Sequence, residues 1–488
     1  MAPPVRLYGF MHPFCHLPAT TLARLIATGQ ATPTEVLEAH IERVASVNPS
    51  VHAVVANRFD AARAEAAAQT EQLAAGATEL PPLFGVPCTV KELIAVEGMP
   101  WTAGVVARQD VTASEDGPQV QRLREAGAIV MGVTNVSEAG LWLESVNRIY
   151  GRTRNPWDLR RSAGGSSGGE AAIIAAGGSP MGLGADIGGS IRNPCFFNGI
   201  VGHKPSGGYL PAAGHWPPVD TVRHRYCVTG PMGRTVQDLE TMMQVLSVDA
   251  DPHADADVPR FQPLAVNPEE VTVHWFVDNG VPLSGRCEPA VRDAVEGTVR
   301  SLARQGFRTE RYEPSHLSLS AEIWGARLAT TGDPTVAQLL GHEGIATLLA
   351  EWAKWPTRRS KHQLISLIMA TFEPVTHVEG RMRSMNAAAD EMRAEIEATL
   401  GPRGVLICPV YPRSAHRHRW PVLRPTAYSY CGVINVLELA ATAVPTGFDR
   451  RKMPVGVQVV AGRHNDPLAL TVARQVEALT PDWQPAPC

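Results

Sequence analysis

The chain has 488 residues, of which 44% are hydrophobic and 19% are charged, and its formal net charge is -4. These values are ordinary for a globular protein and exclude the strongly basic surface that nucleic-acid binding requires. The length exceeds the usual size of a single-core domain, so we expect one large unit that carries an inserted lobe, with two independent domains as the open alternative.

Cysteine usage and the lack of targeting signals indicate the compartment. Eight cysteines are scattered without any Cys-x-x-Cys pair, which favours a reducing environment and gives no metal-ligand spacing. Residues 1–20 lack the basic start and unbroken apolar core of a secretory signal. The longest uncharged stretch, residues 171–185, is shorter than a membrane span of about 20 residues. We therefore expect a cytoplasmic protein with no membrane anchor, no cofactor, no metal and no nucleic-acid partner; a homodimer remains open.

Residues 1–75 are predicted to form an N-terminal helical region. Thr32 can cap a helix that begins at Pro33, and Glu35 completes a capping box. Apolar residues then recur at helical spacing, which indicates that one face of this helix is buried.

Residues 84–248 have the pattern of a catalytic core built from strands and helices. A strand is predicted at Val86–Val90, a helix around 120–126 and a second strand at Ile129–Val133. Strand, helix and strand at this spacing imply a parallel pair with helices covering the sheet. A further helix is expected to begin after Thr235 and to end near Val248.

The rest of the chain is expected to return to the same core. An acidic loop, residues 249–257, is predicted to lie on the surface. Residues 310–400 are mostly helical in pattern, and residues 405–488 regain the strand-like pattern. We therefore predict an α/β fold with a mixed, mostly parallel central sheet, helices on both faces and a helical insertion at 310–400.

Two glycine- and serine-rich segments carry the chemistry. Gly164–Gly169 alone is more typical of a phosphate cradle or a tight turn, although no Lys-Ser/Thr follows it as in a phosphate-binding loop. It leaves open a non-catalytic protein that binds an anion or a nucleotide. Further along, Gly182–Pro194 places Ser190 after paired glycines and shortly before Arg192.

Across residues 164–195 the chain resembles the amidase signature family of Ser-cisSer-Lys hydrolases. The resemblance extends to residues 85–92, 134–138, 444–447 and 454–458, and to Asn435. It implies that Ser190 is the nucleophile, that Ser166 is a bridging serine preceded by a cis peptide bond, and that Lys91 is the base. It also implies an oxyanion hole and a supporting set: the backbone N–H groups of Ile187, Gly188, Gly189 and Ser190, and the side chains of Ser167, Asp186 and Arg192.

The chemistry of amide cleavage explains this choice of residues. A serine hydroxyl is a poor nucleophile until a base removes its proton, and a lysine can do so only if burial lowers its pKa from about 10.4 toward the working pH. Ser166 can then relay the proton from Ser190 to Lys91 and return it to the leaving nitrogen. The product of the first step is an acyl-enzyme on Ser190.

Residues 193–206, with residues 214–217 after them, look like the branch of the family that contains fatty acid amide hydrolases, bacterial aryl acylamidases and some urethanases. This resemblance implies a small, fairly apolar amide, anilide, ester or carbamate substrate. Its expected contacts are the predicted helices near residues 324–372 and four apolar side chains: Met99, Trp101, Leu141 and Trp142.

Alternatives to this interpretation remain. Within the family, the chain could be the glutamine-hydrolysing amidase subunit of a tRNA-dependent amidotransferase. His203 could act as the base of a Ser-His-Asp arrangement, although its Gly-His-Lys-Pro context favours a structural role. Cys195 could act as a thiol nucleophile, although we expect it to be packed.

Overall fold

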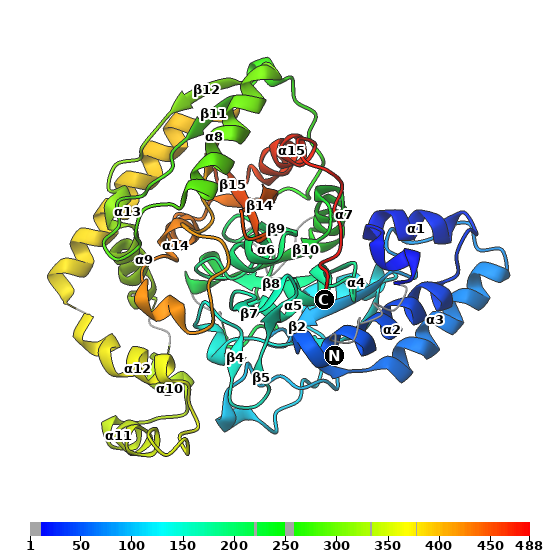
Figure 1. Ribbon diagram of the computed structural model, residues 1–488, viewed down its shortest axis with the longest axis horizontal. Helices are drawn as coiled ribbons and strands as arrows, with labels where there is room; N and C mark the ends of the chain where they lie inside the picture. The colour runs from blue at the N-terminus through cyan, green and yellow to red at the C-terminus, as the bar shows by residue number, and fades with distance from the viewer. Residues whose placement is uncertain (1–10, 219–221, 249–257, 332–333, 377) are drawn as a thin grey trace, which may run out of the picture.

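A computed structural model describes residues 11–218, 222–248, 258–331, 334–376 and 378–488. In this part of the chain, the centre of the molecule is an eleven-stranded mixed sheet (Figure 1). In spatial order its strands are β1 (Val54–Asn57), β3 (Ile129–Thr134), β2 (Pro87–Lys91), β8 (Met181–Asp186), β10 (Val228–Gly233), β9 (Val201–Lys204), β14 (Ala440–Phe448), β15 (Pro454–Ala461), β13 (Gly404–Cys408), β11 (Thr272–Trp275) and β12 (Arg308–Arg311).

Parallel pairing is limited to two parts of this sheet. β2 is parallel to β3 and β8, and β11 is parallel to β12 and β13, whereas every other neighbouring pair is antiparallel. The predicted mixed sheet is therefore confirmed, but it is not mostly parallel. The reason is that short connections, such as the one between β14 and β15, can join only antiparallel neighbours, whereas parallel neighbours need a longer crossover.

Helices cover both faces of the sheet. On one face, α5 and α6 pack on β8 and β9, and a Cβ placed on Gly202 of β9 would meet Cys195 of α6. On the other face, α7 packs on β9 and β10 and contacts α4 and α15. The helices are α1 (Ala19–Ala27), α2 (Pro33–Val51), α3 (Phe59–Ala74), α4 (Pro118–Glu125), α5 (Gly168–Ala175), α6 (Arg192–Asn198), α7 (Val236–Leu246), α8 (Pro289–Arg304), α9 (Ser320–Ala329), α10 (Val336–Leu339), α11 (Ile345–Lys354), α12 (Leu364–Thr376), α13 (Glu379–Leu400), α14 (Ser429–Val436) and α15 (Asp466–Glu477).

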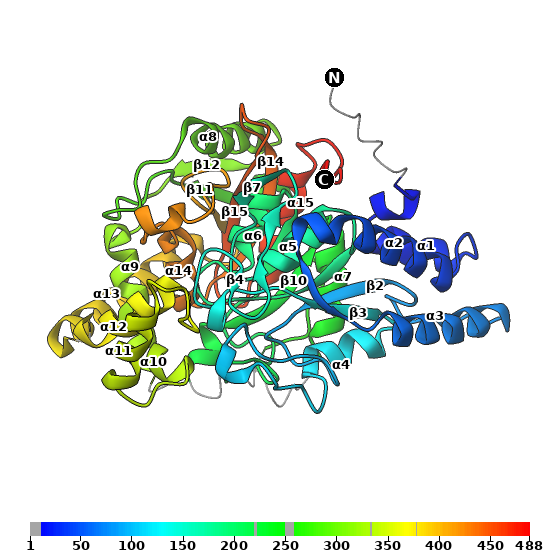
Figure 2. The same ribbon diagram turned by 60° about the horizontal axis from the view of Figure 1, so that its bottom comes forward.

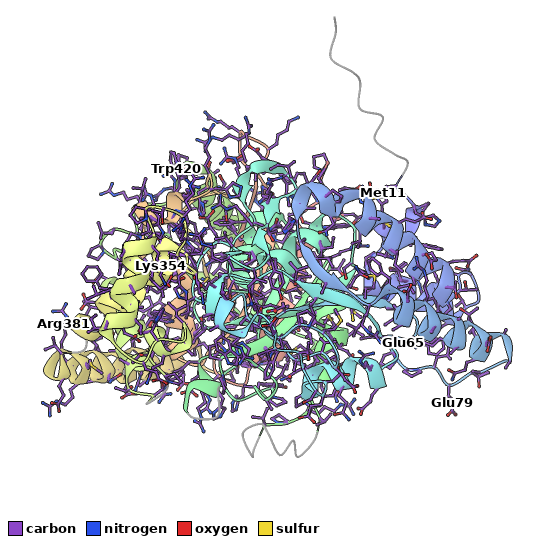
Figure 3. The ribbon with its side chains drawn as sticks, turned by 90° about the horizontal axis from the view of Figure 1, so that it is seen from below. Met11, Glu65, Glu79, Lys354, Arg381 and Trp420 are labelled. Carbon is purple, nitrogen blue, oxygen red and sulfur yellow. The ribbon has the colours of Figure 1, made fainter. Side chains whose placement is uncertain are left out.

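The two ends of the molecule are helical and are formed by different parts of the chain. Helices α1 to α3 lie at one end, and α9 to α13 lie at the opposite end in both ribbon views (Figures 1 and 2). Seen from below, Glu65 and Glu79 mark the first end and Lys354 and Arg381 the second (Figure 3). The nucleophile candidate lies between these ends, where the sheet is covered by α5 and α6.

Several elements match the sequence-based predictions. Thr32 caps α2 with Glu35 in a complete capping box, and Thr235 caps α7, which ends at Leu246. β1, which pairs with β3 at the sheet edge, lies inside the region predicted to be helical; its four residues are too few for the alternation that indicates a strand. The predicted acidic loop at 249–257 lies outside the described residues.

Candidate active site

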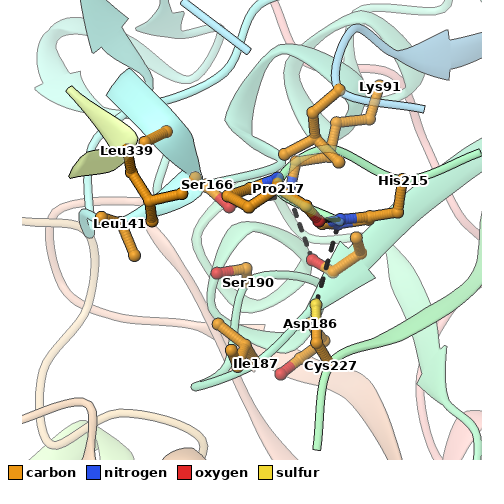
Figure 4. A pocket seen from close by; sticks show the side chains of 14 residues that line it. Lys91, Leu141, Ser166, Asp186, Ile187, Ser190, His215, Pro217, Cys227 and Leu339 are labelled. Atoms are coloured by element: carbon orange, nitrogen blue, oxygen red, sulfur yellow. Dashed lines mark hydrogen bonds between the residues drawn. The ribbon is translucent and has the colours of Figure 1, made fainter. Parts of the chain in front are cut away.

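Lys91 ends β2 and is buried, with 1% of its surface exposed. Its Nζ donates to Ser166 Oγ at 2.7 Å and to the carbonyl oxygen of Ala185 at 3.1 Å (Figure 4). Burial lowers the pKa of Lys91 to about 7, although the nearby groups Cys227, Asp186 and Glu170 oppose this shift. A lysine in this environment is partly neutral at neutral pH and can accept a proton.

Glu170 in α5 is a buried neighbour of this lysine that sequence reasoning missed. Its carboxyl group accepts hydrogen bonds from Thr89 and, at 2.8 Å, from Thr134. Burial raises the pKa of Glu170 to about 8, so the carboxyl group is largely protonated at pH 7. When Glu170 is ionised its charge raises the pKa of Lys91 and opposes the effect of burial, so the protonation of this carboxyl group is coupled to that of the lysine.

Ser166 and Ser167 stand at the start of α5, where the chain turns beside the end of β8. The Gly165–Ser166 peptide bond is cis, as the family resemblance implies. Ser167 donates its backbone N–H to the Ser190 carbonyl oxygen at 3.1 Å, and its hydroxyl donates to the Ala185 carbonyl oxygen at 3.3 Å. These contacts tie the two serine-bearing segments together, and Ser166 and Ser190 line one pocket.

The loop that carries Ser190 connects β8 to α6 and is wrapped around Asp186. The Asp186 carboxylate accepts the N–H groups of Gly189 at 2.6 Å and Ile191 at 3.0 Å. The expected role of Gly189 as an oxyanion donor is therefore corrected, because its N–H already has a partner. Among the described hydrogen bonds, the N–H groups of Ile187, Gly188 and Ser190 have none, and these three stay candidate donors.

The paired glycines of this loop are not equivalent. Gly189 has a φ of +109°, and a Cβ at this position would lie 2.7 Å from both Asn193 and Cys431. At Gly188 a Cβ would meet only the Trp324 ring, at the ordinary contact distance of 3.4 Å. A side chain would therefore obstruct the loop at Gly189 and not at Gly188.

Arg192 links the loop to helix α14 and strand β15. Both Arg192 and Asp186 are fully buried and form an ion pair at 3.0 Å. The same guanidinium donates to Asn435 Oδ1 at 2.5 Å and to Gln458 Oε1 at 2.8 Å. Burial alone would raise the pKa of Asp186, but the Arg192 guanidinium holds it well below its usual range. Asp186 and Arg192 thus fix the conformation of the loop. Their hydrogen bonds explain the presence of both buried side chains, and neither needs a role in proton transfer.

The pocket beside Ser190 is small, with a volume of about 40 Å³, and is lined mainly by apolar groups. Leu141 and Leu339 form part of its wall, together with His215, Pro217 and Cys227 (Figure 4). His215 Nε2 lies 3.7 Å from Cys227 Sγ. His215 lies in the segment 214–217, which carried part of the family resemblance but was given no role in the site. No sequence motif singled out Cys227 or Leu339, because only the fold brings these segments together.

Of the four side chains predicted to bind substrate, only Leu141 lines this pocket. Met99 is packed in the core with 6% of its surface exposed, and Trp101 donates its indole N–H to the Leu93 carbonyl oxygen at 3.0 Å. Trp142 lines a neighbouring cavity instead. Neither Met99 nor Trp101 lines this pocket, because apolar character alone does not distinguish a pocket wall from a core.

The helical insertion reaches the site at two points. Trp324 of α9 donates its indole N–H to the Ile187 carbonyl oxygen at 2.7 Å, and Leu339 ends α10 in the pocket wall. The insertion therefore contacts the backbone of the nucleophile loop directly. Sequence reasoning placed substrate contacts in the predicted helices near residues 324–372, a range that begins at Trp324, but did not single out Leu339.

The alternative nucleophile and base lie elsewhere. His203 is buried and bonded to Thr442 Oγ1 at 2.8 Å and to Asp466 Oδ1 at 3.1 Å, so both ring nitrogens have partners away from Ser190. Cys195 is fully buried in α6, and burial raises the pKa of its thiol well above the usual value. Among the residues that the structure describes, no three His, Cys, Asp or Glu side chains are grouped to hold a metal ion.

The fold and this arrangement define an amide hydrolase, and the chain belongs to the amidase family: the family model described as Amidase matches residues 35–470. The chain is 38% identical to fatty-acid amide hydrolase 2-A of Danio rerio over 98% of this chain and 91% of that protein. It is 31% identical to an acylamidase of Rhodococcus erythropolis over 96% of this chain and 97% of that one. A solved bacterial aryl acylamidase shares the fold with a TM-score of 0.80 at 22% identity, covering 96% of this chain and 97% of that one.

Within the described residues, no helix is both long enough and apolar enough to cross a membrane.

Proposed function

We propose that the chain hydrolyses amides through an acyl-enzyme on Ser190, with Lys91 as the base and Ser166 as the proton relay. The observation that carries this proposal is the 2.7 Å hydrogen bond between buried Lys91 and Ser166 in the pocket that Ser190 lines. Neutral Lys91 takes the Ser166 proton as Ser166 takes the proton of Ser190. The Ser190 oxygen then attacks the substrate carbonyl carbon.

Collapse of the tetrahedral intermediate requires the proton to return. Protonated Lys91 gives it back through Ser166 to the leaving nitrogen, because an amine leaves poorly as an anion. The unpartnered N–H groups of Ile187, Gly188 and Ser190 would stabilise the oxyanion. Water then attacks the acyl-enzyme by the same route and releases the acid.

We further propose that small apolar anilides, esters and carbamates are substrates. A planar acyl carbonyl of any of these classes presents the same oxygen to the loop donors, and the relay can protonate either oxygen or nitrogen. Because the pocket of about 40 Å³ is far smaller than usual ligand sites of about 300–1,000 Å³, Leu141 and Leu339 must move when substrate enters.

Labelling with a serine-reactive sulfonyl fluoride tests the nucleophile. Mass spectrometry of the intact protein should show one adduct, peptide mapping should place it on Ser190, and the Ser190→Ala variant should stay unmodified. A folded wild-type protein that is not labelled, or is labelled elsewhere, would contradict the proposal and favour a binding protein.

A substrate panel tests the proposed specificity. Acetanilide, a p-nitrophenyl ester, an N-phenyl carbamate and L-glutamine should be compared on the same preparation. We expect release of aniline from the anilide and the carbamate and no ammonia from glutamine. Ammonia release from glutamine without any release of aniline would instead support the amidotransferase-subunit alternative.

A further inference from the structure

A second and much larger cavity lies next to the catalytic pocket. Its volume is about 570 Å³, within the range of sites for small organic ligands. It is lined by residues 142–152 of the core, by residues 355–365, which run from the end of α11 into α12, and by residues 419–422. The proposed catalytic residues do not line it.

The charge of this cavity is strongly positive. Four arginines line it, and the only acidic side chain in its wall is Glu144: the arginines are Arg148, Arg152, Arg358 and Arg419. Glu144 is already engaged, because its two oxygens accept the Arg419 backbone N–H at 2.9 Å and contact His418 Nδ1 at 3.2 Å. A net positive charge is therefore left for a ligand.

The guanidinium groups have few partners of their own. Among the described residues, the side chains of Arg152, Arg358 and Arg419 make no hydrogen bond and no ion pair, and the buried Nε of Arg152 is unsatisfied. Arg148 uses only Nε, which donates to the His362 carbonyl oxygen at 3.1 Å. Burial lowers the pKa of Arg152, and a bound anion would relieve that unfavourable environment.

Apart from Gln363, the remaining wall is apolar and aromatic. Trp142 and Trp355 lie in it together with Leu364, Ile365 and Val422. A small inorganic ion would leave these surfaces in contact with water, whereas a hydrocarbon or aryl body would cover them. The combination matches a ligand with one anionic group and one apolar body.

The cavity and the catalytic pocket share a wall. Leu141 lines the pocket and Trp142 lines the cavity. Behind this wall, a Cβ placed on Gly165 would lie 2.3 Å from the Trp142 carbonyl oxygen, so this backbone packs directly on the residue that precedes Ser166. His362 also contacts Glu138 Oε1 at 2.9 Å, which ties the insertion side of the cavity to the same core segment.

We propose that this arginine-lined cavity binds the carboxylate of an amphiphilic organic acid, with the aryl or alkyl body of the acid against Trp142 and Trp355. Two kinds of molecule could supply this carboxylate and its apolar body. The ligand is either the distal acid group of an amide substrate or a separate organic acid that occupies the cavity during turnover. Binding itself does not depend on the proposed function of Ser190.

Isothermal titration with 4-phenylbutyrate tests the site, with 4-phenylbutan-1-ol as the uncharged match. We expect the carboxylate to bind at least tenfold more tightly than the alcohol, and its affinity to fall as salt is raised. Arg152→Gln should weaken carboxylate binding at least tenfold. Arg358→Gln, which changes an exposed side chain, should weaken it severalfold, and Arg300→Gln on α8 serves as the control without effect.

Equal binding of acid and alcohol, or unchanged binding in both Arg152→Gln and folded Arg358→Gln, would overturn the proposal. So would binding of phosphatidylserine vesicles that depends on Arg152 while 4-phenylbutyrate does not bind. Inhibition of acetanilide hydrolysis then separates the sources: competitive inhibition indicates the substrate's own acid group, and noncompetitive inhibition indicates a separate acid. Titration measures binding without turnover. A failure to label Ser190 would therefore contradict the proposed function, and a failure to bind 4-phenylbutyrate would independently contradict the proposed cavity ligand.

Discussion

Arg192 at the nucleophile loop and Arg152 at the arginine-lined cavity are the same residue type in opposite situations. Arg192 is fully buried, and its guanidinium is bonded to Asp186, Asn435 and Gln458. Arg152 is half-buried and has no hydrogen-bond partner among the described residues. The polar groups around the Ser190 loop thus bond to one another. The guanidinium group of Arg152 in the neighbouring cavity is left available to a ligand.

The largest effect is expected where the chemistry itself is removed. Ser190→Ala should reduce turnover at least about 10⁴-fold, and Lys91→Ala and Ser166→Ala by about 10²–10⁴-fold each. Circular dichroism and thermal unfolding should show an intact fold in all three. Full activity of folded Ser190→Ala would show that Ser190 is not the nucleophile.

Breaking the network should cost stability as well as activity. Arg192→Met leaves Asp186 buried without its cation, and we expect the free energy of unfolding to fall by about 3–5 kcal/mol. Chemical denaturation measures this change. Arg358→Gln at the cavity rim is the matched comparison and should change the free energy of unfolding by less than about 0.5 kcal/mol. Similar losses in the two variants would contradict the distinction.

The two glycines sharpen the comparison within the loop itself. Gly189→Ala should lower kcat about 100-fold, because the new Cβ collides with Asn193 and Cys431 and displaces the neighbouring donor of Ser190. Gly188→Ala should lower kcat less than about tenfold, since its Cβ only touches Trp324. Steady-state kinetics on one anilide separates the two, and a reversed order would refute this account of the loop.

The pH profile tests the environment of Lys91. Since its pKa is lowered to about 7 and only the neutral amine accepts a proton, the competent fraction rises from about one tenth at pH 6 to about nine tenths at pH 8. We expect kcat/KM to follow this rise. An optimum near pH 5 would be incompatible with lysine as the base.

The smallest effect is expected at the pocket wall. Leu339→Ala removes part of the barrier contributed by the insertion, and we expect kcat/KM for bulky anilides to rise about 3- to 10-fold relative to acetanilide. Competition between the two substrates in one reaction gives this ratio directly. An unchanged ratio would show that Leu339 does not limit access.

Sequence reasoning was most successful where function depends on a contiguous segment. The capping box at Thr32 and the helix that begins after Thr235 were predicted from neighbouring residues, and the cis bond before Ser166 was implied by the family resemblance of one continuous segment. Such features depend on neighbouring residues, so they can be recognised from the sequence alone. The α/β class followed from the same local signals.

The rest depends on contacts between distant segments. His215, Cys227 and Leu339 join one pocket from separate elements, and Glu170 meets Lys91 only because α5 packs beneath β2. Gly189 was expected to donate to an oxyanion because the motif does not reveal that Asp186 already occupies its N–H. An apolar residue such as Met99 has the same pattern whether it lines a pocket or fills a core.

The separation along the chain between Arg192 and its partner Gln458 has a consequence for protein synthesis. Arg192 bonds to Gln458, which lies 266 positions later in the chain. At about 5–20 residues per second, translation of that interval takes roughly 13–53 s. During this time the nascent loop has Asp186 and Arg192 without Gln458. The full set of hydrogen bonds made by Arg192 can therefore form only after β15 has been synthesised.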